Sequence, residues 1–358
     1  MVWSLGASAE AVDSADRLVQ LEAWAEALVD GSGHMGQHVS LAVDLAGGRH
    51  LTYYEFLPNG TRRLKYARSV GEGWTTQTVD ASGNVGGVSS LALDAAGRPQ
   101  VSYFDYASQS LRMARWTGER WAIEVVDGLE SVGVDSALAL DSRGQPHIAY
   151  YDLTNGDLKY AQRQGTHWRL ETVDSDGDVG AEATLALDAS DRPHIGYLDR
   201  ADRVLKYAHF TGARWNIELV DAVSHAAGPS LALDAAGRPH LSYFDRFRDR
   251  LRCARREGQS WSTQTLLKVR PSLRTALAFD GHGGAHLALQ EPGGALFYLR
   301  QEGTGPWRVA ALEQLREAAW GVTLALDPGG APQICYSDLA DHALRCANRG
   351  QPEVARKP

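Results

Sequence analysis

Residues 184–221 read TLALDASDRPHIGYLDRADRVLKYAHFTGARWNIELVD, and this stretch decides the fold. It contains four short runs of apolar and aromatic residues, and the residues between the runs are typical of turns. We therefore expect four short strands in succession. The stretch recurs seven times along the chain, which makes the repeat the organising feature of the sequence.

Two independent markers give the period of this repeat. The first is a Leu-Ala-Leu-Asp element, and its aspartates are spaced by 50, 47, 47, 46, 46 and 47 residues. The second is a tryptophan at nearly the same spacing. This period matches one four-stranded blade, so the sequence predicts an all-β, closed, seven-bladed β-propeller. The aspartates are Asp44, Asp94, Asp141, Asp188, Asp234, Asp280 and Asp327, and the tryptophans are Trp24, Trp74, Trp121, Trp168, Trp215, Trp261 and Trp307.

The two markers are out of step at the ends of the chain. Trp24 precedes the first Leu-Ala-Val-Asp, and no tryptophan follows the last repeat. Residues 24–30 (WAEALVD) match residues 215–221 (WNIELVD) of the quoted stretch. We therefore predict that Trp24–Asp30 forms the outer strand of the last blade, which closes the ring and removes an open sheet edge.

The repeat resembles bacterial propeller repeats related to NHL and BNR modules. Leu231 to Asp234, Gly237, Pro239 with His240, and Tyr243 to Asp245 carry the resemblance, which covers about residues 24–348. It implies the fold much more than an activity. The Ser-x-Asp-x-Gly-x-Thr-Trp box of sialidase-type propellers and the Trp-Asp dipeptide of WD repeats are absent from the sequence, so neither family's function follows.

Seven blades account for nearly all of the 358 residues. We expect a propeller over residues 24–348, an N-terminal extension over 1–23 with a short helix near 7–20, and a C-terminal tail over 349–358. The net charge is −8 and no basic stripe is present, which argues against nucleic acid as a partner. No apolar run approaches the roughly 18 residues of a membrane span. We expect a soluble monomer, cytoplasmic as the chain stands, or secreted if an N-terminal signal has been removed.

The three cysteines are odd in number and lack metal-type spacing. Cys253 and Cys346 occupy equivalent positions in the third strand of their blades, where other blades carry Tyr or Met. We interpret these two residues as small buried hydrophobic side chains and expect no disulfide framework.

A histidine recurs at the start of the second strand of most blades. Because this position lies off the axis, the imidazoles are too widely spread to share one metal ion, and we expect structural hydrogen bonds instead. The set comprises His50, His147, His194, His240 and His286, with Gln100 and Gln333 at the two remaining positions.

Function is expected where the repeats differ. The loop that enters each inner strand lies beside the axis, on the face opposite the Asp-x-x-Gly turns. Two residues before the small residue that precedes Leu-Ala-Leu-Asp, every blade has one position that we call the station. The seven station residues are His38, Val88, Asp135, Glu182, Gly228, Arg274 and Gly321.

Four of these station residues are ionisable, and they point to chemistry at one central mouth. His38, Asp135 and Glu182 are candidates to hold a single divalent metal ion or to act as acid–base groups, and Arg274 is placed to hold an anion. Further candidates for ligand binding lie in the same loops: His34, Gln37, His225 and Trp320. An alternative is that these loops are ordinary solvated surface.

Three classes of function stay open. The leading hypothesis is a binding propeller that recognises a small molecule, glycan or peptide at the axial mouth near blades 6, 7 and 1, where the repeats diverge most. The second is a metal-assisted lyase or hydrolase at the same mouth, and the third is a protein-interaction scaffold. The sequence lacks a Gly-x-Ser-x-Gly elbow, a P-loop, a His-Glu-x-x-His helix and a dinucleotide fingerprint, which lowers the weight of familiar hydrolase and nucleotide chemistry.

Overall fold

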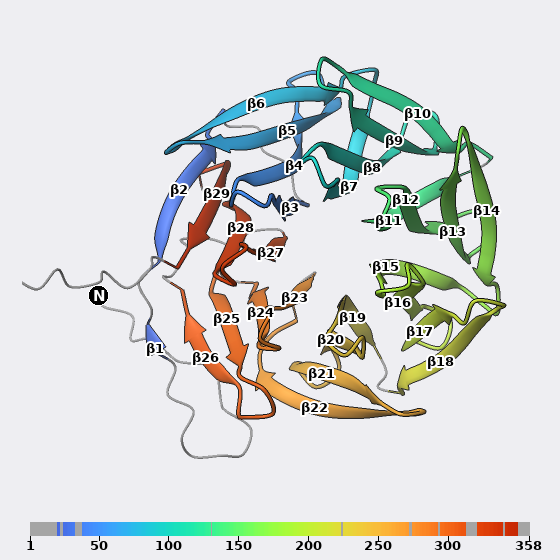
Figure 1. Ribbon diagram of the computed structural model, residues 1–358, viewed down its shortest axis with the longest axis vertical. Coiled ribbons are helices and arrows are strands. Elements are labelled where there is room, and N and C mark those ends of the chain that lie inside the picture. Colours follow the sequence, from blue (N-terminus) through green and yellow to red (C-terminus); the bar gives the residue numbers. More distant parts are fainter. Residues whose placement is uncertain are drawn as a thin grey trace, which may run out of the picture.

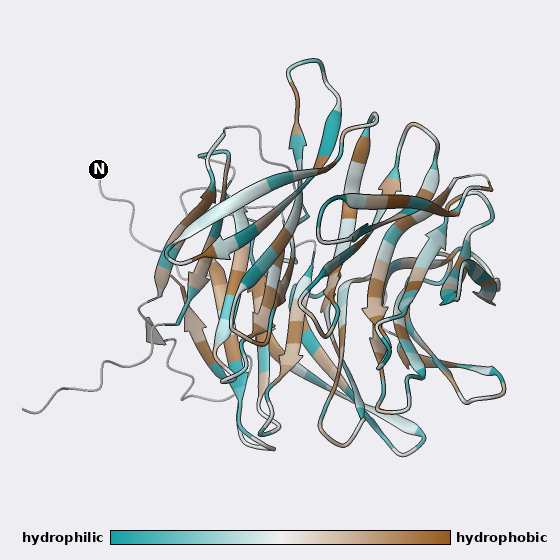
Figure 2. Cartoon of the chain, turned by 45° about the horizontal axis from the view of Figure 1, so that its top comes forward, coloured by the Kyte–Doolittle hydropathy of each residue, from teal (hydrophilic) through white to brown (hydrophobic). Residues whose placement is uncertain are grey.

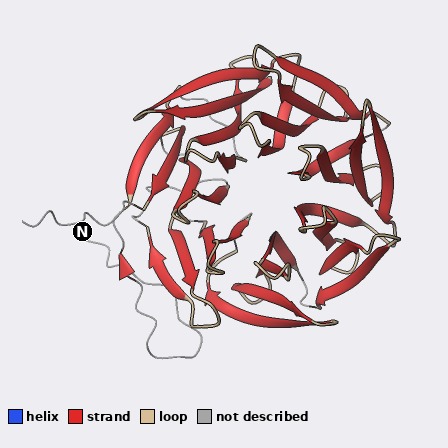
Figure 3. Cartoon of the chain, in the orientation of Figure 1, coloured by secondary structure: helices blue, strands red, loops and turns tan. Residues whose placement is uncertain are grey.

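Seven β-sheets are arranged in a ring around a central axis (Figure 1). The computed structural model describes residues 20–21, 24–32, 38–129, 131–222, 225–271, 274–292, 294–312, 321–338 and 341–349. Within these ranges every regular element is a strand, as Figure 3 shows. None of these residues belongs to a helix that could cross a membrane. The predicted seven-bladed propeller is confirmed.

Each blade is an antiparallel sheet whose first strand faces the axis and whose fourth lies at the perimeter (Figure 1). Blade 1 consists of β3 (Ser40–Val43), β4 (Arg49–Phe56), β5 (Arg62–Val70) and β6 (Gly73–Asp80), and blade 2 of β7 (Val85–Leu93), β8 (Pro99–Asp105), β9 (Ser110–Trp116) and β10 (Trp121–Asp127). Blade 3 consists of β11 (Val132–Leu140), β12 (Pro146–Asp152), β13 (Asp157–Gln164) and β14 (His167–Asp174), and blade 4 of β15 (Val179–Leu187), β16 (Pro193–Asp199), β17 (Val204–Phe210) and β18 (Trp215–Asp221). Blade 5 consists of β19 (Ala226–Leu233), β20 (Pro239–Asp245), β21 (Arg250–Glu257) and β22 (Ser260–Lys268). Blade 6 consists of β23 (Thr275–Phe279), β24 (Ala285–Gln290), β25 (Leu296–Gln301) and β26 (Arg308–Ala311). Blade 7 consists of β27 (Val322–Leu326), β28 (Pro332–Asp338), β29 (Ala343–Asn348) and β2 (Ala25–Asp30).

The N-terminal segment closes the ring, as predicted. Strand β2 pairs antiparallel with β29, with Ala27 opposite Cys346. Strand β1 (Gln20–Leu21) was not expected: it pairs parallel with β26 and gives blade 6 a fifth strand. The helix predicted near residues 7–20 lies outside the described residues except for Gln20, which belongs to β1. The other domain boundaries stay predictions.

The Asp-x-x-Gly turns follow from local chemistry. In blade 2, one carboxylate oxygen of Asp94 accepts the amides of Ala96 and Arg98, both at 2.9 Å. Gly97 has a φ of +71°, which glycine adopts without steric cost. Each turn therefore reverses the chain between the first and second strands on the same face of the ring, which we call the turn face.

Hydrogen bonds and apolar contacts join neighbouring blades. Apolar residues (brown) lie mainly on the strands, where the blades pack, and many polar residues (teal) lie in the turns (Figure 2). A tyrosine in the second strand donates to an aspartate that ends the outer strand of the preceding blade, as in Tyr150 to Asp127 at 2.8 Å and Tyr197 to Asp174 at 2.6 Å. These bonds hold the blades in one register around the ring.

The recurring histidines have the structural role that we predicted. In blades 1 and 6, Nε2 of the imidazole lies 3.1 Å from the aspartate of the turn and Nδ1 meets the hydroxyl of a third-strand tyrosine. Donation from Nε2–H to the carboxylate leaves Nδ1 as an acceptor for the tyrosine hydroxyl. The two tyrosine hydroxyls lie 2.5 Å from His50 and 2.6 Å from His286.

The prediction that the cysteines form no disulfide is wrong for two of them. Cys335 and Cys346 are bonded to each other, and both are fully buried. They face each other across β28 and β29. The repeat register contains this information, because Ser102 and Met113 face each other at the same positions of blade 2. Cys253 is free, and only it fits our interpretation of an unbonded thiol.

The buried imidazoles make stability depend on pH. Burial lowers the pKa of His194 to about 4. Because this value lies below that of an unfolded histidine, the unfolded chain binds the proton more readily, so stability falls as the pH decreases from about 6.5 to about 4. Urea unfolding measures how much the free energy of unfolding decreases between pH 7 and pH 4.5. In His194→Gln, this decrease should be smaller than in the wild-type protein by about 2 kcal/mol. Glutamine already occupies this position in two blades, and replacing the exposed His167 is the matched control. An unchanged pH dependence would contradict this account.

Candidate functional site

The ring has two chemically different faces. The Asp-x-x-Gly turns lie on the turn face, and the loops that lead from each outer strand to the next inner strand lie on the opposite face around the axial mouth. The sequence predicts functional residues at the axial mouth. The structure has a further pocket on the turn face.

Five of the seven station residues share an unusual backbone conformation. His38, Asp135 and Glu182 have φ values of +71°, +55° and +52°, and Gly228 and Gly321 have +59° and +93°. A side chain in this left-handed region costs about 1 kcal/mol relative to glycine. Three blades thus carry a polar side chain where glycine would be less strained, which is typical of positions selected for a role beyond folding.

Two station carboxylates join neighbouring blades. Oδ2 of Asp135 accepts the amide of Glu182 at 3.1 Å, and Oε2 of Glu182 accepts the amide of Gly228 at 2.6 Å. Arg274 of blade 6 reaches Asp135 of blade 3, with 3.5 Å between Nη2 and Oδ1. The structure therefore brings together Asp135, Glu182 and Arg274, as the sequence indicated.

His38 lies near the same charges, and its side chain forms no hydrogen bond with any described residue. Its Nδ1 is buried and unbonded. Burial and the charge of Arg274 lower the pKa of His38 to about 4, against the opposing charge of Asp135. At neutral pH, His38 is therefore an uncharged imidazole. Burial also raises the pKa of the Glu182 carboxyl, although the hydrogen bond from the Gly228 amide and the charge of Arg274 oppose this shift.

Of the other predicted residues, only His225 lies within the described ranges. His225 has its Nε2 3.0 Å from a guanidinium nitrogen of Arg203. His34, Gln37 and Trp320 lie outside the described residues. Among the residues that the structure does describe, no group of three or more His, Cys, Asp or Glu side chains could hold a metal ion. The predicted axial metal ion therefore has no ligand set in this part of the chain, and the catalytic, metal-binding and ligand-binding roles stay predictions.

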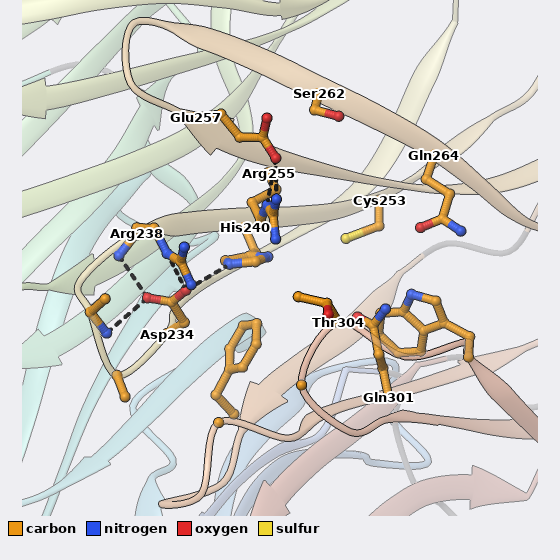
Figure 4. A pocket seen from close by; sticks show the side chains of 16 residues that line it. Asp234, Arg238, His240, Cys253, Arg255, Glu257, Ser262, Gln264, Gln301 and Thr304 are labelled. Atoms are coloured by element: carbon orange, nitrogen blue, oxygen red, sulfur yellow. Dashed lines mark hydrogen bonds and ion pairs between the residues drawn. The ribbon is translucent and has the colours of Figure 1, made fainter.

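A pocket of about 440 Å³ opens on the turn face between blades 5 and 6. In Figure 4, Cys253 and Gln264 of blade 5 lie opposite Gln301 and Thr304 of blade 6. A pocket of about 170 Å³ lies between blades 3 and 4, where Tyr160 and Trp215 are among the lining residues. The pocket between blades 5 and 6 is the larger of the two.

Its size follows from one residue of the repeat. Four blades carry a third-strand tyrosine whose ring meets the outer tryptophan of the next blade edge-on, with ring centroids 5.1–5.3 Å apart. Blade 5 has Cys253 at this position, and the tryptophan that follows is Trp307. The thiol is much smaller than a phenol, so the volume of a tyrosine side chain is left open.

The outer tryptophans of the other blades each have a stacking partner, which Trp307 lacks among the described residues. Arg49 stacks on Trp74 and Arg163 on Trp168, with 4.9 and 5.4 Å between the guanidinium carbon and the ring centroid. Four further tryptophans meet tyrosines. Within the described ranges, no ring or guanidinium stacks on Trp307, although this residue is only 3% exposed. Trp307 instead packs among apolar side chains of the core, including Leu266, Phe297 and Val309.

The charged residues of this pocket neutralise one another. Arg238 pairs with Asp234 at 2.7 Å. Arg255 pairs with Glu257. Burial raises the pKa of the Cys253 thiol to about 12, so this group stays uncharged. The lining thus has no excess of either charge.

Several uncharged polar groups remain available in the pocket. Nε2 of His240 lies 3.2 Å from Asp234, which leaves Nδ1 as an acceptor on the side where other blades have the tyrosine hydroxyl. The side chains of Ser262, Gln264 and Thr304 line the pocket and form no hydrogen bond with any described residue. Phe279 adds an apolar wall, and its ring centroid lies 4.6 Å from that of His240.

The sequence contained one signal for this pocket, and our interpretation of it was incomplete. We noted that Cys253 replaces Tyr or Met but treated it only as a packing residue. The replacement leaves a histidine without its tyrosine, a combination that the other histidine-bearing blades lack. A position where a repeat loses its usual large side chain can therefore indicate a pocket, as can a position where it gains an unusual one.

Solved structures with similar folds include lectins. The BP39L lectin from Burkholderia pseudomallei has a TM-score of 0.62 and 13% identity, over 87% of this chain and 98% of the lectin. The fucose-specific lectin from Aleuria aurantia has a TM-score of 0.52 and 16% identity, over 78% and 97%. AofleA from Arthrobotrys oligospora has a TM-score of 0.56 and 12% identity, over 81% and 90%. At these identities, the similarity shows the propeller fold alone.

No protein-family model matches the chain, and no curated protein does. The resemblance to NHL and BNR repeats therefore stays a prediction. The Aleuria aurantia lectin is described as a six-bladed propeller, whereas this chain has seven blades.

Proposed function

We propose that this protein is a carbohydrate-binding propeller and that an uncharged sugar occupies the pocket between blades 5 and 6. The observation that carries the proposal is the pocket left open by Cys253 beside Trp307, on which no described ring or guanidinium stacks. Its volume of about 440 Å³ lies within the range of small-ligand sites.

The chemistry of the lining favours an uncharged, hydroxyl-rich ligand. Both arginines are already paired with carboxylates, so a charged ligand would have to break an ion pair to gain another. The free groups of His240, Ser262, Gln264 and Thr304 can accept from or donate to hydroxyls. The ring of Phe279 provides an apolar surface of the kind that sugar C–H groups contact. The similar folds of lectins support this assignment.

The other hypotheses are less well supported. A metal-assisted lyase or hydrolase at the axial mouth needs a ligand group that the described residues do not form. A scaffold role would not require an open pocket with free polar groups. Ligand binding at the axial mouth near blades 6, 7 and 1 is a second candidate, because Arg274 and His38 retain unused hydrogen-bonding capacity there.

Isothermal titration calorimetry with a panel of neutral mono- and oligosaccharides, including L-fucose, tests the proposal. We expect binding of one equivalent of at least one sugar. Gln264→Ala should weaken this binding about three- to tenfold, the range for one lost hydrogen bond. Gln77 occupies the equivalent position in blade 1, facing Tyr66 rather than Cys253, so Gln77→Ala is the matched control and should bind normally. Absence of sugar binding, or equal affinities in the Gln264→Ala and wild-type proteins, would refute the proposal.

A further inference from the structure

We infer that the axial mouth is a second binding site, specific for an oxyanion group, a carboxylate or a phosphate, held by Arg274, Arg62 and His38. This site lies on the face opposite the sugar pocket and does not depend on it. It takes a ligand of different chemistry because the mouth has unused positive charge, whereas the pocket has none.

The negative charges at the mouth are already engaged. Asp135 and Glu182 each accept the amide of the next station residue, which fixes both carboxylates against the wall. Burial also raises the pKa of Glu182, which disfavours its charged form. These carboxylates therefore act mainly as links between blades 3, 4 and 5.

The positive charges are less fully paired. Arg62 is stacked against three aromatic rings, with its guanidinium carbon 5.4 Å from the centroid of Tyr54, 4.9 Å from Phe56 and 5.0 Å from Tyr106. It forms no ion pair with any residue that the structure describes. Stacking on the ring faces holds the guanidinium in place, and the Arg62 side chain forms no hydrogen bond with any described residue, so its N–H groups stay available for an anion.

Arg274 has one partner and spare donors. Its contact with Asp135 is long, at 3.5 Å, and its side chain is 31% exposed. A guanidinium has five N–H donors and binds a carboxylate or a phosphate through two of them. Asp135 thus holds the arginine loosely in position, and an incoming oxyanion can occupy the remaining donors or displace Asp135.

His38 lies within the electrostatic influence of both Arg62 and Arg274. Its ring is stacked on Tyr54, with 6.5 Å between centroids, and Tyr54 in turn lies against Arg62. Both guanidiniums are close enough for their charge to lower the pKa of His38. The buried Nδ1 has no partner, and an uncharged imidazole can donate one hydrogen bond to an oxyanion.

Gly321 of blade 7 lies beside the backbone of His38. It has a φ of +93°, which favours glycine, and a Cβ added there would be in van der Waals contact, 3.4 Å from the amide nitrogen of His38. The specialised sector predicted at blades 6, 7 and 1 thus provides two arginines, one imidazole and a glycine beside them.

Calorimetric titration with inorganic phosphate and with succinate, at constant ionic strength, tests the inference. We expect saturable binding of one equivalent of at least one of them, and the better ligand identifies the oxyanion. Arg274→Gln and Arg62→Gln should each weaken binding at least tenfold, the effect of removing a charge-assisted hydrogen bond. Arg248→Gln is the control, since Arg248 already pairs with Asp245.

Asp135→Asn distinguishes a ligand site from a structural ion pair. Asparagine can still accept the amide of Glu182 but releases Arg274, so oxyanion affinity should rise about three- to tenfold. Gln264→Ala should leave oxyanion binding unchanged, which separates this site from the sugar pocket. The inference fails if neither anion saturates the wild-type protein, if Arg274→Gln binds as well as wild type, or if folded Asp135→Asn binds no more tightly.

Discussion

Cys253→Tyr should abolish sugar binding and make the protein more stable. The introduced ring would occupy the pocket between blades 5 and 6, as the third-strand tyrosines do between other blades. Its hydroxyl would meet Nδ1 of His240, as Tyr66 meets His50 at 2.5 Å. Its ring would meet Trp307 edge-on, as Tyr207 meets Trp261 with 5.1 Å between centroids.

Calorimetry and urea unfolding measure both effects. We expect affinity to fall at least 100-fold, because the ligand and the phenol cannot occupy the same space. Stability should rise by about 1–3 kcal/mol from the newly buried apolar area and one hydrogen bond. Cys253→Ala, which keeps the space open, should bind sugar with near wild-type affinity. Retained sugar binding in folded Cys253→Tyr would place the ligand elsewhere.

A chain that begins at Gly31 should not form a stable monomeric ring. It lacks β2, so β29 becomes an open edge able to pair with other molecules. Tyr53 loses its bond of 2.8 Å to Asp30, and Tyr336 loses its bond of 2.5 Å to Glu26. Together with the loss of buried Val29, these changes should cost at least about 4 kcal/mol.

A chain that begins at Trp24 is the matched control for this truncation. It loses β1 but keeps β2, and it should remain a folded monomer. Size-exclusion chromatography and thermal unfolding compare the two truncated proteins with the full chain. If the shorter protein unfolds at the same temperature as the control and stays monomeric, β2 does not close the ring in the way described here.

The fold could be predicted from the sequence because the repeat determines it at every level. The Leu-Ala-Leu-Asp strands, the glycine turns and the outer tryptophans recur with one period, and the mismatch at Trp24 indicates the closing strand. Strand β1 could not be predicted in this way, since Gln20 and Leu21 lie outside the repeat. Its pairing with β26 is a tertiary contact with no local signal.

The sites were less predictable than the fold. The sequence indicated that Asp135, Glu182 and Arg274 converge, because a repeat places equivalent positions around one axis. It could not reveal that the two carboxylates accept amides from the next blade, since this depends on the left-handed backbone at Asp135 and Glu182. The disulfide was missed because Cys335 and Cys346 were compared with metal motifs and not with the cross-strand register.

The pocket between blades 5 and 6 was missed for a related reason. We sought residues added to the repeat, and this pocket results from one that is absent. Cys253 leaves His240 and Trp307 without the tyrosine that their counterparts contact. The turn face also appeared purely structural, because its histidines lie off the axis and are too widely spread to share one metal ion.

The central claim is that an uncharged sugar occupies the space left open by Cys253. The most direct test is a crystal structure of the wild-type protein soaked with the sugar that binds most tightly in the calorimetric panel. Our account predicts electron density for the sugar between blades 5 and 6, within hydrogen-bonding distance of His240 and Gln264. Sugar density elsewhere on the ring, with this pocket empty, would contradict it.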